Sequence, residues 1–298
     1  MADGLVALSN SLAELVARLE TSLVRVEGRQ RRGATGVVYD EGGSVVTAAH
    51  ALGRADSVML TAPDGSTQAA AVIGRDPSTD VALLRASLPK ATPAPWSDAT
   101  PRVGQMVLAL ARPGRTVRAS LGIVGASAEG FRTAWGGQID RFLQADLEPP
   151  PGFSGGLLVG VGGEAFGMTS AALSRGAGLT IPVSTLRRVV GELLAHGRVK
   201  RGYLGVSVYP VRLPPAMAAA GQQDGALVVA VEPDSPADKA GLMLGDVLLS
   251  LNGASLRGPD DLLTLLRDQA AAEVTLRFLR GGAPQQATFV TGERGQEA

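Results

Sequence analysis

The chain contains no cysteine and only two histidines among its 298 residues. The absence of cysteine excludes disulfide bonds, iron–sulfur clusters, thiolate zinc sites and cysteine nucleophiles. Two histidines leave little for a metal centre built from imidazoles. We therefore expect no metal and no cofactor, and any covalent catalysis has to use a hydroxyl group.

An excess of charge of either sign is also missing, because 28 Lys and Arg residues balance 28 Asp and Glu residues. A net charge of zero removes the basic surface that is typical of nucleic-acid binding, so we expect no nucleic-acid partner. Long apolar runs are absent as well: the run Leu227–Val231 is far shorter than the roughly 20 residues of a membrane span. The start, Met1–Gly4, lacks the basic region of a signal peptide. Taken literally, the sequence predicts a cytoplasmic protein, or a periplasmic or extracytoplasmic one if an export signal was trimmed.

What the chain has in quantity is glycine and proline, 39 and 18 residues, whereas aromatic residues make up 4%. This composition predicts many turns between short elements, and cores of aliphatic side chains. The length suggests two domains, each large enough to bury its own core.

Helical spacing of leucine and valine predicts an amphipathic helix over residues 1–21, either packed on its own domain or used for self-association. Short β-type runs separated by turn signals fill residues 22–84 and 105–181. Two sets of about six strands predict two antiparallel barrels in one domain, residues 22–197. A helix closes this domain, with Ser184 as its N-cap, His196 in its last turn and Gly197 at C′.

A short basic connector, residues 198–201, precedes a separate α+β pattern over 202–293, and residues 294–298 form a tail. The strands expected in this second domain are Tyr203–Tyr209, Ala226–Val231, Asp246–Leu251, Val274–Leu279 and Gln286–Val290. A helix is expected at Pro259–Gln269. The predicted fold class is therefore mainly β, a double antiparallel β-barrel followed by a small α+β domain.

Ser154 is the strongest candidate nucleophile, because glycines lie on both sides of it in the run Gly152-Phe153-Ser154-Gly155-Gly156. A tight glycine turn exposes a serine hydroxyl and lets a substrate backbone approach closely. The N–H groups of Gly152 and Ser154 can then point at one spot, as an oxyanion hole requires. The alternative is an ordinary glycine-rich surface turn.

A serine nucleophile needs a general base, usually a histidine that a carboxylate holds. His196 lies at the end of a predicted helix, where a cation is favourable, and is interpreted as structural. His50 follows a predicted strand and becomes the candidate base once it is paired with Ser154. Asp80 opens an apolar strand and supplies the candidate carboxylate. The order His50, Asp80, Ser154 is the one found on double β-barrels.

Three runs carry a family resemblance: Thr47-Ala48-Ala49-His50, Thr79-Asp80-Val81-Ala82-Leu83, and Gly155-Gly156 after Ser154. Together they resemble trypsin-like serine proteases of the HtrA (DegP/DegS) type, from about Val24 to the end of the chain. The resemblance implies a chymotrypsin-like double barrel followed by a PDZ domain. It also implies an ATP-independent serine endopeptidase of protein quality control and stress response, a homotrimer that cleaves unfolded or misfolded polypeptides.

In a PDZ-like domain, Tyr203, Leu204, Gly205 and Val206 would form the carboxylate-binding loop and the first groove strand. A peptide C-terminus would add as a strand beside Val206 and place its carboxylate on backbone N–H groups. The alternative is a structural domain that binds no peptide.

Two positions depart from the family pattern. The family usually has Asn before the serine and Pro after the two glycines, and this chain has Phe153 and Leu157 there. A bulky aromatic side chain in this turn can favour an inactive peptide orientation or restrict access to the site. The alternative function is therefore a catalytically impaired pseudoprotease that acts as a peptide-binding or chaperone protein.

Two further expectations concern substrate selection and regulation. Residues Ala165–Leu173 and Gly178–Ile181 carry no charge, so the pocket they are expected to line should prefer a small or medium apolar residue before the cut. The segment Ala126–Arg141, with Phe131 and Trp135, is expected to be the loop that transmits PDZ occupancy to the active site.

Overall fold

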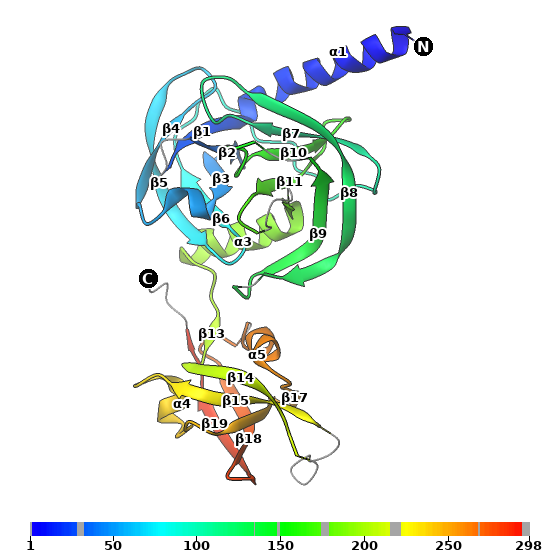
Figure 1. Cartoon of the computed structure of the whole chain (residues 1–298). Helices are drawn as coiled ribbons and strands as arrows, with labels where there is room; N and C mark the ends of the chain where they lie inside the picture. The colour runs from blue at the N-terminus through cyan, green and yellow to red at the C-terminus, as the bar shows by residue number, and fades with distance from the viewer. Residues whose placement is uncertain are drawn as a thin grey trace. The chain divides into compact units, whose positions relative to one another are not determined.

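The computed structural model describes residues 2–28, 33–133, 135–147, 150–173, 179–214, 222–267 and 269–293. The chain divides into two compact units, Met1–Val199 and Lys200–Ala298. The first unit contains two closed barrels, and the second contains an antiparallel sheet with short helices (Figure 1). The predicted tail, residues 294–298, lies outside the described residues.

The first barrel is antiparallel and closed, in the strand order β1-β2-β3-β6-β5-β4. Its strands are β1 (Leu23–Glu27), β2 (Ala34–Val38), β3 (Ser44–Ala48), β4 (Ser57–Thr61), β5 (Thr67–Asp76) and β6 (Val81–Arg85). Its interior is aliphatic, with Val24, Val45 and Leu84 fully buried. A single helical turn, α2 (Ala49–Leu52), follows β3.

The second barrel has the order β10-β11-β12-β9-β8-β7, so the prediction of two six-stranded barrels is confirmed. Its strands are β7 (Met106–Ala111), β8 (Arg118–Arg132), β9 (Gln138–Asp146), β10 (Leu157–Gly160), β11 (Ala165–Ser170) and β12 (Leu179–Pro182). Strands β8 and β9 form a long hairpin that takes in most of the segment expected to be a loop at 126–141, of which Ala134 is not described. Phe131 packs edge-on against Phe142 across this hairpin, 5.6 Å between ring centroids, whereas Trp135 is exposed.

Two longer helices flank the barrels, α1 (Ala2–Leu19) and α3 (Val183–His196), with a 3-10 turn, η1 (Glu20–Ser22), after α1. The predicted N-cap Ser184 is wrong by two residues, because β12 runs directly into the helix and the extended Pro182 occupies the cap. Gly197 ends α3 in the left-handed conformation, as predicted.

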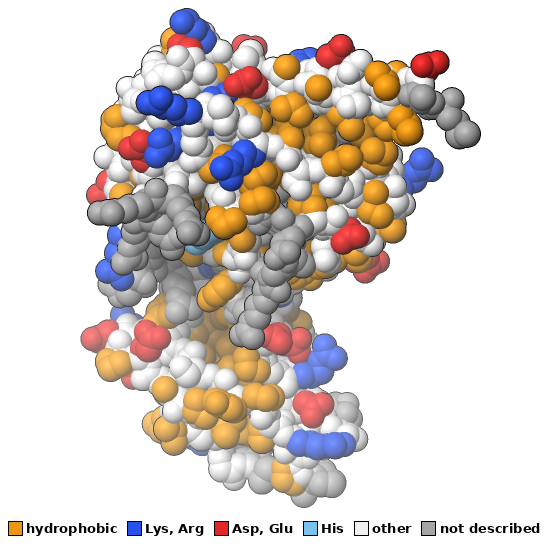
Figure 2. All heavy atoms as spheres, turned by 45° about the horizontal axis from the view of Figure 1, so that its top comes forward, with side chains coloured by type: hydrophobic (Ala, Val, Ile, Leu, Met, Phe, Trp, Pro, Cys, Tyr) orange, Lys and Arg blue, Asp and Glu red, His pale blue; other side chains and the backbone are white. Residues whose placement is uncertain are grey.

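Helix α1 contacts the barrels through one end. Leu15 and Leu19 are buried, whereas Leu5, Val6 and Leu8 are exposed on the projecting turns. Figure 2 shows hydrophobic side chains gathered on the side of the first unit from which α1 extends. No helix of the described residues has the length and apolarity that crossing a membrane requires.

The second unit is built on the strand order β14-β15-β16-β18-β19, which leaves β14 (Val206–Arg212) at an edge. The other strands are β13 (Gly202–Tyr203), β15 (Asp224–Val231), β16 (Val247–Leu251), β17 (Ala254–Ser255), β18 (Glu273–Arg280), β19 (Ala283–Val290) and β20 (Gly292–Glu293). Two helices accompany them, α4 (Pro236–Lys239) and α5 (Pro259–Leu266). Helix α5 ends before the predicted Gln269, because the chain leaves it through a turn in which the Gln269 N–H donates to the Leu266 carbonyl.

Candidate active site

Helix α2 places His50 directly against Asp80. His50 Nδ1 lies 2.9 Å from both carboxylate oxygens of Asp80, and the His50 backbone N–H donates to Asp80 Oδ1 at 2.9 Å. The carboxylate is 2% exposed, whereas the imidazole is 43% exposed. A carboxylate at Nδ1 favours the tautomer with its proton on Nδ1, which leaves Nε2 free to accept a proton from a nucleophile.

Asp80 also makes His50 a stronger base. The hydrogen bond between the two side chains raises the pKa of His50 above its usual value near 6.5, partial burial of the ring lowers it, and the negative charge of Asp80 adds to the increase. The net upward shift means that the imidazolium is stabilised at the moment when the ring takes up a proton.

The local backbone fixes Asp80 in an unusual conformation. Its φ of 58° lies in the left-handed region, which aspartate tolerates better than most residues. The preceding turn is held by Asp76, whose carboxylate accepts hydrogen bonds from the Ser78 and Thr79 hydroxyls at 2.6 and 2.7 Å. The Asp80 carbonyl accepts from the Ala49 N–H at 3.1 Å, which ties this turn to the start of α2.

Ser170 is a site residue that the sequence did not reveal. At the end of β11, its hydroxyl donates a 2.6 Å hydrogen bond to Asp80 Oδ2. The next residue, Ala171, donates its N–H to Ser154 Oγ at 3.2 Å. The end of β11 therefore brings the candidate nucleophile and the His50–Asp80 pair to one place. Among the described residues, no hydrogen bond joins Ser154 Oγ to the imidazole of His50.

The turn before Ser154 has the geometry of a type II turn. Phe153 N–H donates to the Pro150 carbonyl at 3.2 Å, Pro151 occupies the second position, and Gly152 at the third has a φ of 95°. Proline and then glycine at these positions are the signature of this turn type, because the third residue needs a positive φ. Within the described part of the chain, the N–H groups of Gly152 and Ser154 donate no hydrogen bond, so both remain free for an oxyanion. Glu148 and Pro149 lie outside the described residues.

Thr35 of β2 holds this turn from the first barrel. Its hydroxyl donates to the Gly152 carbonyl at 2.9 Å and accepts from the Arg112 N–H at 2.9 Å. Its own N–H donates to the Ser154 carbonyl at 3.2 Å. A Cβ on Gly152 would lie 2.4 Å from the Pro113 Cβ, so only glycine fits at the predicted oxyanion position.

Phe153 anchors the turn from the other side. Its side chain is 2% exposed and belongs to the core of the second barrel, with Leu143, Leu158 and Phe166. The aromatic ring therefore lies in the barrel core and does not restrict access to the site, whereas the inactive peptide orientation stays a prediction. Leu157, the other departure from the family pattern, starts β10 and is fully buried.

The predicted specificity pocket is described only in part. Ala165 and Met168 are fully buried in the core, so their side chains do not line an open pocket. Ala171 and Ala172 are exposed beside Ser154, and Gly178 lies outside the described residues. The preference for a small or medium apolar residue stays a prediction.

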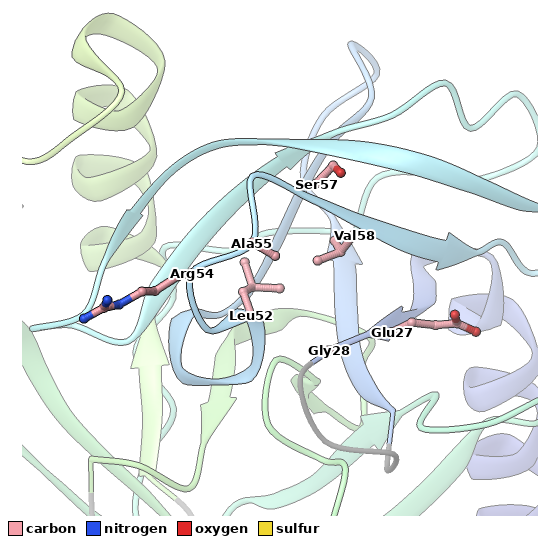
Figure 3. Close-up of a pocket in the computed structure, with 7 residues that line it drawn as sticks. All are labelled: Glu27, Gly28, Leu52, Arg54, Ala55, Ser57 and Val58. Carbon is pink, nitrogen blue, oxygen red and sulfur yellow. The ribbon is translucent and has the colours of Figure 1, made fainter. Parts of the chain in front are cut away.

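A separate pocket of about 600 Å³ adjoins the end of α2 on the first barrel. Figure 3 shows Leu52, Ala55 and Val58 near its centre, with Glu27 and Arg54 extending away from it on opposite sides. It contains none of the predicted site residues.

The second unit has an open strand edge beside an apolar helix. Gly205 has a φ of 82° and leaves no room for a Cβ, which would lie 2.2 Å from the Ser235 Cβ. The carbonyls of Leu204 and Gly205 accept from Ala237 and Glu232 N–H groups at 2.9 and 2.8 Å, which fixes the predicted carboxylate loop. The Tyr203 hydroxyl hydrogen-bonds to Glu232.

After this loop, Val206 and Val208 pack against the core that includes Leu262 and Leu266 of α5. An edge strand next to such a helix can take an added peptide strand.

Comparisons with known proteins agree with both units. A trypsin-like peptidase domain matches residues 34–168, and a PDZ domain matches residues 227–280. A probable periplasmic DegP-like serine endoprotease of Brucella suis biovar 1 (strain 1330) is 36% identical over 251 residues, 80% of this chain and 48% of that protein. A protein of the same description from Halomonas elongata is 32% identical over 270 residues, 87% of this chain and 56% of that protein.

Solved structures extend the likeness to nearly the whole chain. A serine endoprotease from Yersinia pestis has a TM-score of 0.75 at 26% identity and covers 95% of this chain and 98% of its own. The HtrA-type protease AlgW with a decapeptide has a TM-score of 0.75 at 25% identity and covers 96% and 99%. By contrast, the chain spans about half the length of the curated relatives named above.

Proposed function

Because this chain belongs to the HtrA-type trypsin-like serine proteases, with a peptidase domain followed by one PDZ domain, we propose that it is an ATP-independent serine endopeptidase. The observation that carries the proposal is the hydrogen-bonded pair of His50 and Asp80, together with the N–H groups of Gly152 and Ser154, which donate no hydrogen bond among the described residues. No metal or cofactor has a part in this mechanism.

In the proposed mechanism, His50 Nε2 takes the proton of the Ser154 hydroxyl as Ser154 Oγ attacks the scissile carbonyl. Asp80 keeps the imidazole oriented and stabilises the imidazolium. The Gly152 and Ser154 N–H groups hold the negative oxygen of the tetrahedral intermediate. The imidazolium then returns its proton to the leaving amine, and water releases the acyl group by the same route in reverse.

We propose further that the substrates are unfolded or misfolded polypeptides, and that the PDZ domain binds peptide C-termini beside β14. The open edge of β14 and the glycine loop at Gly205 support this binding mode. The periplasmic description of its relatives supports an action outside the cytoplasm. The family resemblance further implies a homotrimer that acts in protein quality control. We expect the end of β8 to transmit peptide binding at the PDZ domain to the active site. There the Thr133 hydroxyl donates a 2.7 Å hydrogen bond to the carbonyl of Ser78, in the turn before Asp80.

The second candidate function is a pseudoprotease that binds peptides or acts as a chaperone. One observation favours it: Ser154 Oγ accepts a hydrogen bond from Ala171 and has none with His50 among the described residues. The hydroxyl proton of Ser154 is nevertheless still available, and catalytic hydrogen bonds are often long before substrate binds.

An active-site fluorophosphonate separates the two functions. The wild-type chain should become labelled and should degrade casein, whereas Ser154→Ala should do neither. Failure of a folded wild-type chain to react with the label or to cleave casein would favour the pseudoprotease. Binding of C-terminal peptides to both chains would test the PDZ domain separately.

A further inference from the structure

An arginine-lined pocket adjoins the oxyanion turn. It encloses about 660 Å³ and is lined by Arg25, Gly33, Pro113, Gly114, Arg115, Thr116, Arg118 and Pro151. Among these described lining residues, three side chains are cationic and none is acidic, although the chain as a whole has equal numbers of acids and bases. Local positive charge of this kind points to an anionic ligand.

The pocket shares its walls with the catalytic turn. Pro151 is the second residue of that turn, and a Cβ built on Gly152 would meet Pro113 at 2.4 Å and the Gly33 carbonyl at 3.0 Å. Arg25 lies directly opposite Thr35 in the β1–β2 ladder, so the two side chains leave the sheet on the same face. The Thr35 hydroxyl in turn donates a hydrogen bond to the Gly152 carbonyl.

The arginine side chains are available for a ligand. Arg115 and Arg118 are exposed, and neither forms an ion pair within the described parts of the chain. Arg25 has Glu27 at 3.7 Å, and its buried Nε has no hydrogen-bond partner among the described residues. The loop that carries Arg115 is fixed by the buried Arg112, whose guanidinium donates to the Arg115 carbonyl at 2.9 Å and to Glu20 Oε1 at 2.6 Å.

The position of the pocket indicates which part of a substrate reaches it. Ala171 contacts Ser154 Oγ from the side where the residue before the cut is expected. Thr35 and Gly33 contact the oxyanion turn, and Ala171 is not among the described residues that line the pocket. An extended chain that crosses Ser154 therefore leaves the site toward the pocket. Each residue adds about 3.3 Å, so the first few residues after the cut span this region.

We infer that this pocket is a substrate subsite that selects a carboxylate side chain within the first three residues after the scissile bond. The inference rests on the proposed endopeptidase activity and defines its substrate class more narrowly. An arginine fork matches a carboxylate in a bidentate fashion, and a partly enclosed pocket screens the pair less than open solvent does.

Internally quenched peptides test the inference. All peptides share one sequence with an apolar residue before the cut. In each peptide, Asp, Asn or Lys occupies the first, second or third position after the cut. We expect kcat/KM to be about tenfold higher for Asp than for Asn at one of these positions, lower still for Lys, and the difference to shrink at high salt.

The double substitution Arg115→Gln with Arg118→Gln should reduce the Asp preference to about twofold or less, by lowering kcat/KM for the Asp peptides. Arg102→Gln, an exposed arginine outside the pocket, is the matched control and should keep the preference. Equal rates for Asp and Asn at all three positions, or a preference that survives the double substitution, would overturn the inference. If the wild-type chain cleaves none of the peptides and does not react with the fluorophosphonate, the endopeptidase proposal itself fails.

Discussion

The hydroxyl of Thr35 donates a 2.9 Å hydrogen bond to the carbonyl of Gly152, which joins the first barrel to the turn that leads to Ser154. Thr35 is fully buried and Gly152 is half-buried, so the bond is partly shielded from competing water. Fixing the Gly152 carbonyl fixes the orientation of the turn, and thereby the direction of the N–H groups on which the oxyanion would lie.

Replacement Thr35→Val should lower kcat about ten- to hundredfold with little change in KM, because the oxyanion forms only in the transition state. Thr61→Val, which removes one hydroxyl of the exposed Thr61–Thr67 pair in the same barrel, is the matched control and should leave kcat unchanged. Steady-state kinetics on a peptide substrate and a thermal melt measure the two effects. A purely structural role for Thr35 would lower the melting temperature and leave the kcat of the folded enzyme intact.

Phe153 gives a second, independent test of the turn. Phe153→Leu keeps an apolar side chain in the core and should retain most of the activity. Phe153→Asn restores the residue usual in the family but places an amide in an apolar core, which costs about 3 kcal/mol of stability and releases the anchor. We expect kcat to fall at least tenfold in Phe153→Asn, with weaker binding of a peptide boronate that mimics the tetrahedral intermediate. An Asn variant as active as wild type would contradict the anchor role.

The sequence predicted the barrels and the triad candidates because each had a strong local signal. Alternating short runs with glycine turns specify closed barrels, and an ordered His50, Asp80 and Ser154 is a rare combination in a chain with two histidines. Within the residues predicted to form β-type runs, the expectation of a loop at 126–141 is wrong, because β8 and β9 continue through most of this segment; β8 is largely exposed there and lacks a clear alternation of apolar side chains.

Other parts of the site depend on contacts between distant segments. Ser170 reaches Asp80 across 90 positions, and the Thr35 hydroxyl reaches Gly152 across 117. Neither residue differs in type from its many exposed counterparts, so only the closure of the two barrels identifies them. Phe153 was identified as a departure, but its effect depends on whether the ring points into the site or into the core, which side-chain type alone does not determine.

The carboxylate loop of the PDZ domain predicts a difference between two glycines. Gly205 and Gly241 both have positive φ, 82° and 75°, but a Cβ on Gly205 would lie 2.2 Å from the Ser235 Cβ, whereas one on Gly241 has nothing within 4 Å. Gly205→Ala should therefore weaken binding of a C-terminal peptide at least tenfold, and Gly241→Ala should not. Isothermal titration with a peptide and its C-terminally amidated form measures this. Equal affinity of the two variants would contradict the assignment of the loop.

The pH dependence of cleavage reports the contact between His50 and Asp80. Because the hydrogen bond from Asp80 raises the pKa of His50 above 6.5, and the base works only when neutral, kcat/KM should fall on acidification with a midpoint above that value. Asp80→Asn should move the midpoint to lower pH and reduce kcat about 10³- to 10⁴-fold. Asp76→Asn is the matched control: this buried carboxylate in the same turn hydrogen-bonds to Ser78 and Thr79, so its loss should destabilise the fold and leave the midpoint in place. A midpoint that is the same in wild type and Asp80→Asn would show that His50 is not the base.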